Sequence, residues 1–170
     1  MGHGSRSGAE LLELLREAGV ALVADVRRFP HSRRHPQHDG AALERSLAEA
    51  GVGYVWLGEG LGGRVPETVP PERSRNGAWR EPAFRRYADV MATPIFQEAF
   101  AELEERARGT RTALLCSERL WWRCHRRLLA DLLDVRGWRV LHLLEPGKRS
   151  EHERTPFARL EQGALVYPAP

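Results

Sequence analysis

The residues best suited to chemistry in this 170-residue sequence lie in one short stretch, Cys116–Arg126. The stretch contains both cysteines of the chain together with a histidine, a carboxylate and three arginines: Cys116, Cys124, His125, Glu118, Arg119, Arg123 and Arg126. Thiols and imidazoles can act as nucleophiles and acid–base groups, and guanidinium groups bind anions. This concentration of reactive side chains predicts a ligand site.

A second basic segment, between Asp25 and Asp39, contains no acid between its two ends. It holds four arginines and three histidines: Arg27, Arg28, Arg33, Arg34, His31, His35 and His38. Paired donors of this kind suit phosphate or carboxylate groups. The alternative is that these side chains are solvated faces of an arginine-biased protein, since 25 of its 26 basic residues are arginine.

The elements that must position these residues follow one repeated order: a helix, a glycine and then an apolar strand. The predicted helices cover residues 7–18, 39–50, 93–107 and 122–136, and the predicted strands follow them at 20–24, 52–57, 112–115 and 138–143. Four such units imply right-handed crossovers. We therefore expect one α/β domain over residues 1–170, a three-layer fold with an open, mainly parallel sheet of about four or five strands and helices on both faces.

Ligands of open α/β sheets bind outside the carboxyl ends of the strands. Both basic segments follow predicted strand ends, so we expect them to meet at one edge of the sheet. Candidate catalytic residues are Cys116 as nucleophile, His125 as acid or base, and Glu118 and Asp25 as bases or as carboxylates that orient an arginine. The candidate ligand-binding residues are Arg27, Arg33, Arg34, Gly62, Gly63, Arg64, Tyr87 and Arg126.

Each of these interpretations has a structural alternative. Cys116 could be a small buried hydrophobe, and His125 could be a core histidine. Cys124 is better explained by packing on the apolar stripe of a helix.

Residues 58–81 lack periodicity and suggest a lid-like loop, with a short helix at 82–91 covering the site. The phosphate-loop pattern is absent, so the glycines near residue 60 are better explained by flexibility.

A metal site is conceivable from Cys116, Cys124 and His125 with the three histidines near residue 35, because thiolates and imidazoles suit zinc. The spacing matches no standard zinc pattern, so we expect neither a metal nor any other cofactor.

No apolar run approaches the roughly 20 residues of a membrane span, and the polar segment Met1–Ser7 does not resemble a secretory signal. We therefore expect a cytoplasmic protein with reduced thiols and no membrane partner.

These residues resemble the family known as domain of unknown function 488. The resemblance covers nearly the whole chain and rests on the following segments: Gly2-His3, Asp25–Pro30, Leu61–Arg64, Trp79, Phe84 with Tyr87, Cys116–Arg126, His142 and Thr155–Arg159. It implies a compact α/β domain whose activity is not established. Family members usually carry a short strand before the Gly-His pair, whereas this sequence starts at Met1. The chain departs from the family pattern at Ser117, where alanine is common, and at His38, where an aromatic residue is common.

The residues together suggest a protein that binds a phosphate-bearing ligand, a nucleotide or nucleic acid, at the strand ends and acts on it. As an enzyme it would be a hydrolase or transferase that uses Cys116, His125 and Glu118. The net charge of +3 agrees with an anionic partner but does not select one. The alternatives are a non-catalytic nucleic-acid-binding module that uses the same arginines and a metal-binding regulator.

Overall fold

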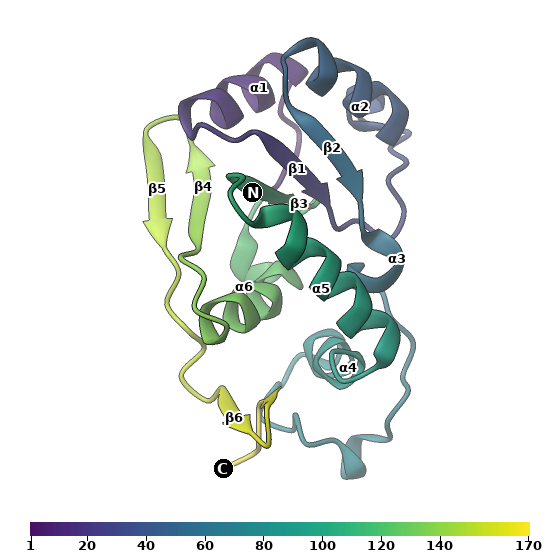
Figure 1. Ribbon diagram of the computed structural model, residues 1–170. Helices are drawn as coiled ribbons and strands as arrows, with labels where there is room; N and C mark the ends of the chain where they lie inside the picture. Colours follow the sequence, from purple (N-terminus) through teal and green to yellow (C-terminus); the bar gives the residue numbers. More distant parts are fainter.

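A three-stranded parallel sheet forms the centre of the computed structural model, which describes residues 1–170 (Figure 1). Its strands are β1 (Leu22–Asp25), β2 (Gly53–Trp56) and β3 (Thr112–Leu115), arranged in the order β2-β1-β3. Residue 22 of β1 lies opposite residue 53 of β2 and residue 112 of β3, so the three strands are aligned. Their carboxyl ends therefore lie at the same edge of the sheet.

Helices cover both faces of this sheet. The helices α1 (Gly8–Glu17) and α2 (Gly40–Glu49) pack their buried leucines against one face, which includes Val23. The next strand residue, Ala24, belongs to the core on the opposite face, as expected from the twofold alternation of a strand. That core is filled from three helices: α4 (Pro82–Val90), α5 (Pro94–Ala107) and α6 (Arg126–Val135).

The helix starts predicted from capping residues are confirmed. Ser7 and Glu10 form a reciprocal capping box at α1, and the side chain of Thr93 accepts a hydrogen bond from the Phe96 amide at α5. The last helix differs, because α6 begins at Arg126 and not near residue 122. A 3-10 turn, η3 (Trp121–Arg123), precedes it, and Cys124 has extended dihedrals of −128° and 149°.

The parallel sheet has three strands and not the predicted four or five. The strand β4 (Leu141–Glu145) forms an antiparallel hairpin with β5 (Lys148–Glu151) beside the sheet (Figure 1). The free edge of β3 is instead occupied by the start of the chain. The Cys116 amide donates to the Met1 carbonyl over 3.3 Å, and the His3 amide donates to the Cys116 carbonyl over 2.9 Å. These bonds use the backbone groups that a fourth parallel strand would need.

Two regions expected to be irregular contain regular structure. The segment after β2 begins with a short helix, α3 (Gly58–Leu61), which packs on α5 and buries Leu61 completely. The remaining short elements are η1 (Pro36–His38), η2 (Pro71–Arg73), and a hairpin of β6 (Arg159–Glu161) with β7 (Ala164–Val166). None of the helices combines the length and the hydropathy that crossing a membrane would require.

Candidate functional site

A cavity of about 440 Å³ lies at the carboxyl ends of the three parallel strands. Its walls come from the loops after each strand, which include Arg27 after β1, Arg64 after β2 and Cys116 after β3. The segment that leads into α6 contributes Cys124 and His125. The position agrees with the rule that open α/β sheets bind ligands beyond their carboxyl ends.

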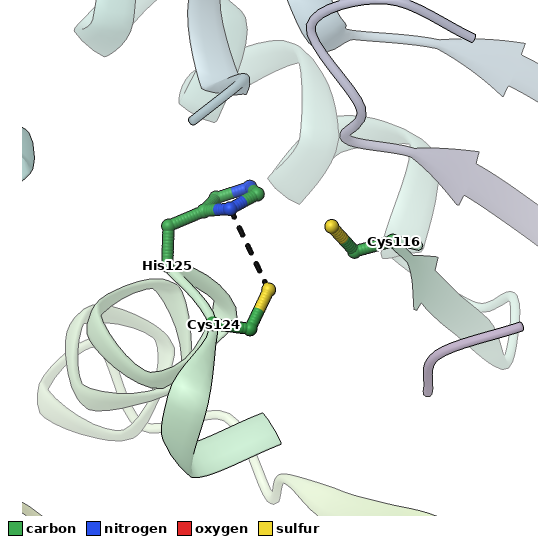
Figure 2. Close-up of side chains that lie close together, drawn as sticks. All are labelled: Cys116, Cys124 and His125. Atoms are coloured by element: carbon green, nitrogen blue, oxygen red, sulfur yellow. Dashed lines mark hydrogen bonds between the residues drawn. The ribbon is translucent and has the colours of Figure 1, made fainter. Parts of the chain in front are cut away.

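Cys116, Cys124 and His125 come together in this cavity and form what we call the Cys/His cluster. One nitrogen or sulfur atom from each residue lies within 4.8 Å of the other two. Figure 2 shows the Cys116 side chain at the end of β3 and the other two at the start of α6, all pointing toward one another. The Nδ1 atom of His125 is 3.5 Å from the Cys124 sulfur.

The backbone fixes which nitrogen of His125 faces the sulfurs. Its Nε2 atom is 3.2 Å from the Val26 carbonyl oxygen, which can only accept a hydrogen bond. Nε2 must therefore carry the proton in this contact, and Nδ1 is left to face Cys124. Gly63 makes room for the ring, because a Cβ atom at this position would lie 2.8 Å from Nδ1.

The pKa values of the two thiols are shifted in opposite directions. The pKa of Cys124 is lowered to about 6, first by its interaction with the adjacent Cys116 thiol and further because Arg126 is nearby; burial opposes this shift. The same interaction between the two thiols, together with burial, raises the pKa of Cys116 to about 11. The Nε atom of Arg126 donates to the Cys124 sulfur over 3.3 Å. The thiolate character suggested for Cys116 by the sequence therefore lies with Cys124.

Asp25 does not line the cavity but holds Arg27, which does. The Asp25 carboxylate is fully buried and accepts hydrogen bonds from Arg27 Nε over 2.8 Å and from the Tyr54 hydroxyl over 2.8 Å. The guanidinium of Arg27 also donates to the His38 carbonyl over 2.7 Å. Burial lowers the pKa of Arg27, but the hydrogen bonds and charge of Asp25 outweigh it, so this pKa is raised. The geometry gives Asp25 a positioning role.

Three further guanidinium groups line the cavity without forming an ion pair with any carboxylate: those of Arg28, Arg64 and Arg123. Glu118 is the one carboxylate among the lining residues. The backbone of Arg64 has a φ of 61°, in the left-handed region that a branched or long side chain adopts at a cost of about 1 kcal/mol or more. Such strain occurs mainly at functional positions.

The structure brings together about half of the residues that the sequence singled out. Among the cavity-lining residues are Arg27, Gly63, Arg64, Tyr87, Cys116, Glu118 and His125. The predicted residues that do not line it are Asp25, Arg33, Arg34, Gly62 and Arg126. Arg33 and Arg34 are exposed on the loop after β1, whereas Arg126 is buried, with one donor to the Glu118 carbonyl.

Cys124 is buried in the core, as the helix pattern predicted, and it also lines the cavity. Four further residues line the cavity although none was predicted as a candidate site residue: Arg28, Arg123, Phe29 and His3. The signal that could have identified Cys124 is its position directly before His125 at the start of a helix. Two of the residues predicted to bind the ligand, Gly62 and Tyr87, make close contacts within the protein itself. A Cβ atom on Gly62 would overlap the Gly58 carbonyl, and the Tyr87 hydroxyl donates to the Leu61 carbonyl over 2.7 Å.

The fold and the cavity define an α/β protein with paired thiols and a histidine at the carboxyl edge of a parallel sheet. The chain belongs to the family described as domain of unknown function DUF488, whose model matches residues 7–133. The matched region contains the whole parallel sheet and the Cys/His cluster. Searches of curated proteins and of solved structures found no significant match.

Proposed function

We propose that the cavity binds a phosphate-bearing ligand, a nucleotide or an end of a nucleic acid, and that the protein acts on it. The observation that carries the proposal is the charge of the lining: the guanidinium groups of Arg28, Arg64 and Arg123 have no carboxylate partners, and Glu118 is the single carboxylate beside them. Unpaired guanidinium groups around a concave site bind phosphate oxygens through charge-assisted hydrogen bonds.

The aromatic side chain of Phe29 supports a ligand that carries a base. Phe29 lines the cavity beside Arg28, yet it is 63% exposed. An exposed ring of this size has no structural role in the core, and it can stack on a nucleobase while the neighbouring guanidinium groups hold the phosphate.

The Cys/His cluster would be the reaction centre. Its three residues line the same cavity as Arg28, Arg64 and Arg123, so a phosphoryl group bound there would lie within reach of the sulfurs and the imidazole. The reaction would be hydrolysis or group transfer. Arg27, held by Asp25, would supply a fixed positive charge beyond the carboxyl end of β1.

Nucleotide binding to the Arg64→Asn variant tests the proposal. Asparagine tolerates the left-handed conformation of residue 64, so the variant should fold, whereas loss of a guanidinium contact should weaken binding of a nucleoside diphosphate about tenfold. Arg108→Ala serves as the control, because Arg108 is an exposed arginine paired with Glu105 and does not line the cavity. Equal affinity of the wild type and both variants, measured by calorimetry, would refute the ligand assignment.

A non-catalytic nucleic-acid-binding module is the second candidate, favoured by Arg33 and Arg34. Both are exposed and lie outside the cavity, on the loop that also carries Phe29. In this case the double variant Arg33→Ala/Arg34→Ala should weaken binding of a short oligonucleotide and reduce its salt dependence, because fewer phosphates are neutralised. The cavity-binding proposal expects the same variant to bind a mononucleotide as the wild type does.

A further inference from the structure

We propose that the Cys/His cluster is a metal site that binds zinc or a similar divalent ion through the sulfurs of Cys116 and Cys124 and the Nδ1 atom of His125. Two thiolates and one imidazole are a ligand set that zinc prefers. The three residues already point toward a common position (Figure 2), and their ligand atoms lie within 4.8 Å of one another.

The distances agree with a tetrahedral ion. Zinc–sulfur bonds of about 2.3 Å and zinc–nitrogen bonds of about 2.0 Å place neighbouring ligand atoms roughly 3.5 to 3.8 Å apart. The separation between Cys124 Sγ and His125 Nδ1 is 3.5 Å, already at this value. The Cys116 sulfur lies within 4.8 Å of the other two ligand atoms, so it would have to approach them by no more than about 1 Å to reach the same spacing.

The groups around the cluster suit its role as a ligand set. Histidines that bind metals commonly donate their second ring N–H to a carbonyl or carboxylate, which fixes the ring and leaves the other nitrogen for the metal. His125 has this arrangement, with Nε2 3.2 Å from the Val26 carbonyl. The hydrogen bond from Arg126 Nε to the Cys124 sulfur, at 3.3 Å, supports a coordinated thiolate in the same way.

The protein supplies three ligands, so the fourth position of a tetrahedral ion would be open. His3 also lines the cavity, but its ring nitrogens are 2.9 Å from the Gly4 carbonyl and 3.3 Å from Arg27, and it lies outside the cluster. Three protein ligands with one open position are typical of catalytic zinc sites, whereas structural sites have four. Because all three ligand residues line the cavity, a ligand in the fourth position would come from it.

Metal binding has a simple proton balance. Each of the two thiols loses its proton to the solvent as its sulfur becomes a ligand, the imidazole binds in its neutral form, and one water molecule takes the fourth position. No oxidant or reductant is required. The metal site goes beyond the proposed ligand binding and does not depend on it, because the arginines of the cavity contribute no ligand atom.

Cobalt titration tests the metal site, since Co²⁺ replaces zinc in tetrahedral sites and reports its ligands in the visible and near-ultraviolet spectrum. The reduced, chelator-treated protein should bind one equivalent of Co²⁺, with sulfur-to-cobalt charge-transfer bands and the ligand-field bands of a tetrahedral ion. The variants Cys116→Ser, Cys124→Ser and His125→Asn should each lower the affinity by at least about tenfold. Cysteine variants should also lose charge-transfer intensity.

Matched controls separate a ligand role from a folding role. Ser117→Ala changes the neighbour of Cys116, and His31→Gln changes a histidine that lines the cavity outside the cluster; both should bind Co²⁺ as the wild type does. Circular dichroism of each variant without metal establishes whether it is folded. Nucleotide titration of the metal-free wild type tests the proposed ligand separately, so the two proposals can fail independently.

Two results would overturn the metal site. The first is a reduced wild-type protein, with both thiols titratable, that shows no cobalt bands. The second is cobalt affinity unchanged in folded Cys116→Ser and Cys124→Ser variants. If the first result is accompanied by ready closure of a Cys116–Cys124 disulfide under a mild thiol oxidant, the cluster is a redox dithiol instead.

Discussion

Arg27 illustrates how one residue of the site depends on another that the ligand would not touch. Its guanidinium is only 5% exposed and donates three hydrogen bonds to a fully buried carboxylate, Asp25. Asp25 is the last residue of β1 and Arg27 lies two residues beyond it, so the sheet fixes Asp25 and Asp25 fixes Arg27. Both charges are removed from water, and breaking such a pair leaves the remaining charge buried without compensation.

Asp25→Asn should therefore destabilise the protein strongly. The amide keeps the shape of the carboxylate but not its charge, so we expect the free energy of unfolding to fall by about 3 kcal/mol. Asp39→Asn is the matched control on the same loop, because Asp39 pairs with His31, whose side chain is 80% exposed. Its effect should stay below about 1 kcal/mol. Urea denaturation measures both, and equal effects of the two substitutions would contradict the positioning role of Asp25.

At the scale of elements, the start of the chain determines the shape of the site as much as the strands do. Residues 1–4 run beside the end of β3, and Gly2 forms a parallel bridge with Cys116. This segment closes the edge that β4 would otherwise occupy and brings His3 to the cavity. The backbone at Gly2 lies very close to the backbone at Glu118, because a Cβ atom on Gly2 would overlap the Glu118 carbonyl oxygen.

Gly2→Ala should disturb the carboxyl end of β3 for this reason. The obstacle is backbone and cannot rotate away, so we expect a loss of about 1 to 3 kcal/mol in unfolding free energy, comparable to overpacking in a core. Gly8→Ala is the control, since a Cβ atom at Gly8 meets nothing within 4 Å and alanine favours the α1 helix. Thermal unfolding should separate the variants, and a neutral Gly2→Ala would show that the segment does not pack as described.

Across the whole molecule, the elements predicted correctly are those encoded by local patterns. Helices α1 and α5 have capping residues and apolar stripes within their own segments, and the apolar runs of β1 and β3 are short and continuous. The pairing of β4 is not encoded locally. Its sequence resembles another parallel strand, but the start of the chain lies beside the end of β3, and β4 pairs with β5 instead.

The candidate site, like the fold, could be predicted from the sequence only in part. The alignment of parallel strands implies that Arg27 and Cys116 lie at one edge, and both line the cavity. The direction of Cys124 was not predictable from helix periodicity, because the helix starts two residues later and the extended backbone at Cys124 turns its side chain to the cluster. A helical stripe predicts a side-chain direction only for residues inside the helix.

The stability of the whole protein should depend on a buried polar network that connects α6 with the two hairpins. His142 on β4 bonds to His152 over 3.0 Å, His152 bonds to Asp131 on α6 over 3.0 Å, and Asp131 accepts from the Tyr167 hydroxyl over 2.9 Å. Burial, followed by the charge of His152, lowers the pKa of His142 from 6.5 to about 3. The network is thus built for a neutral His142.

Acid should weaken the fold through this histidine. Below pH 6.5 the unfolded chain binds a proton at residue 142 that the folded chain does not accept until about pH 3, so the free energy of unfolding falls as the pH is lowered through this window. We expect a loss on the order of 2 kcal/mol by about pH 4.5. His142→Gln should remove this part of the pH dependence, whereas His31→Gln, at an exposed site, should retain it. Urea titrations at several pH values provide the measurement, and parallel pH profiles for the wild type and His142→Gln would exclude His142 as the group responsible.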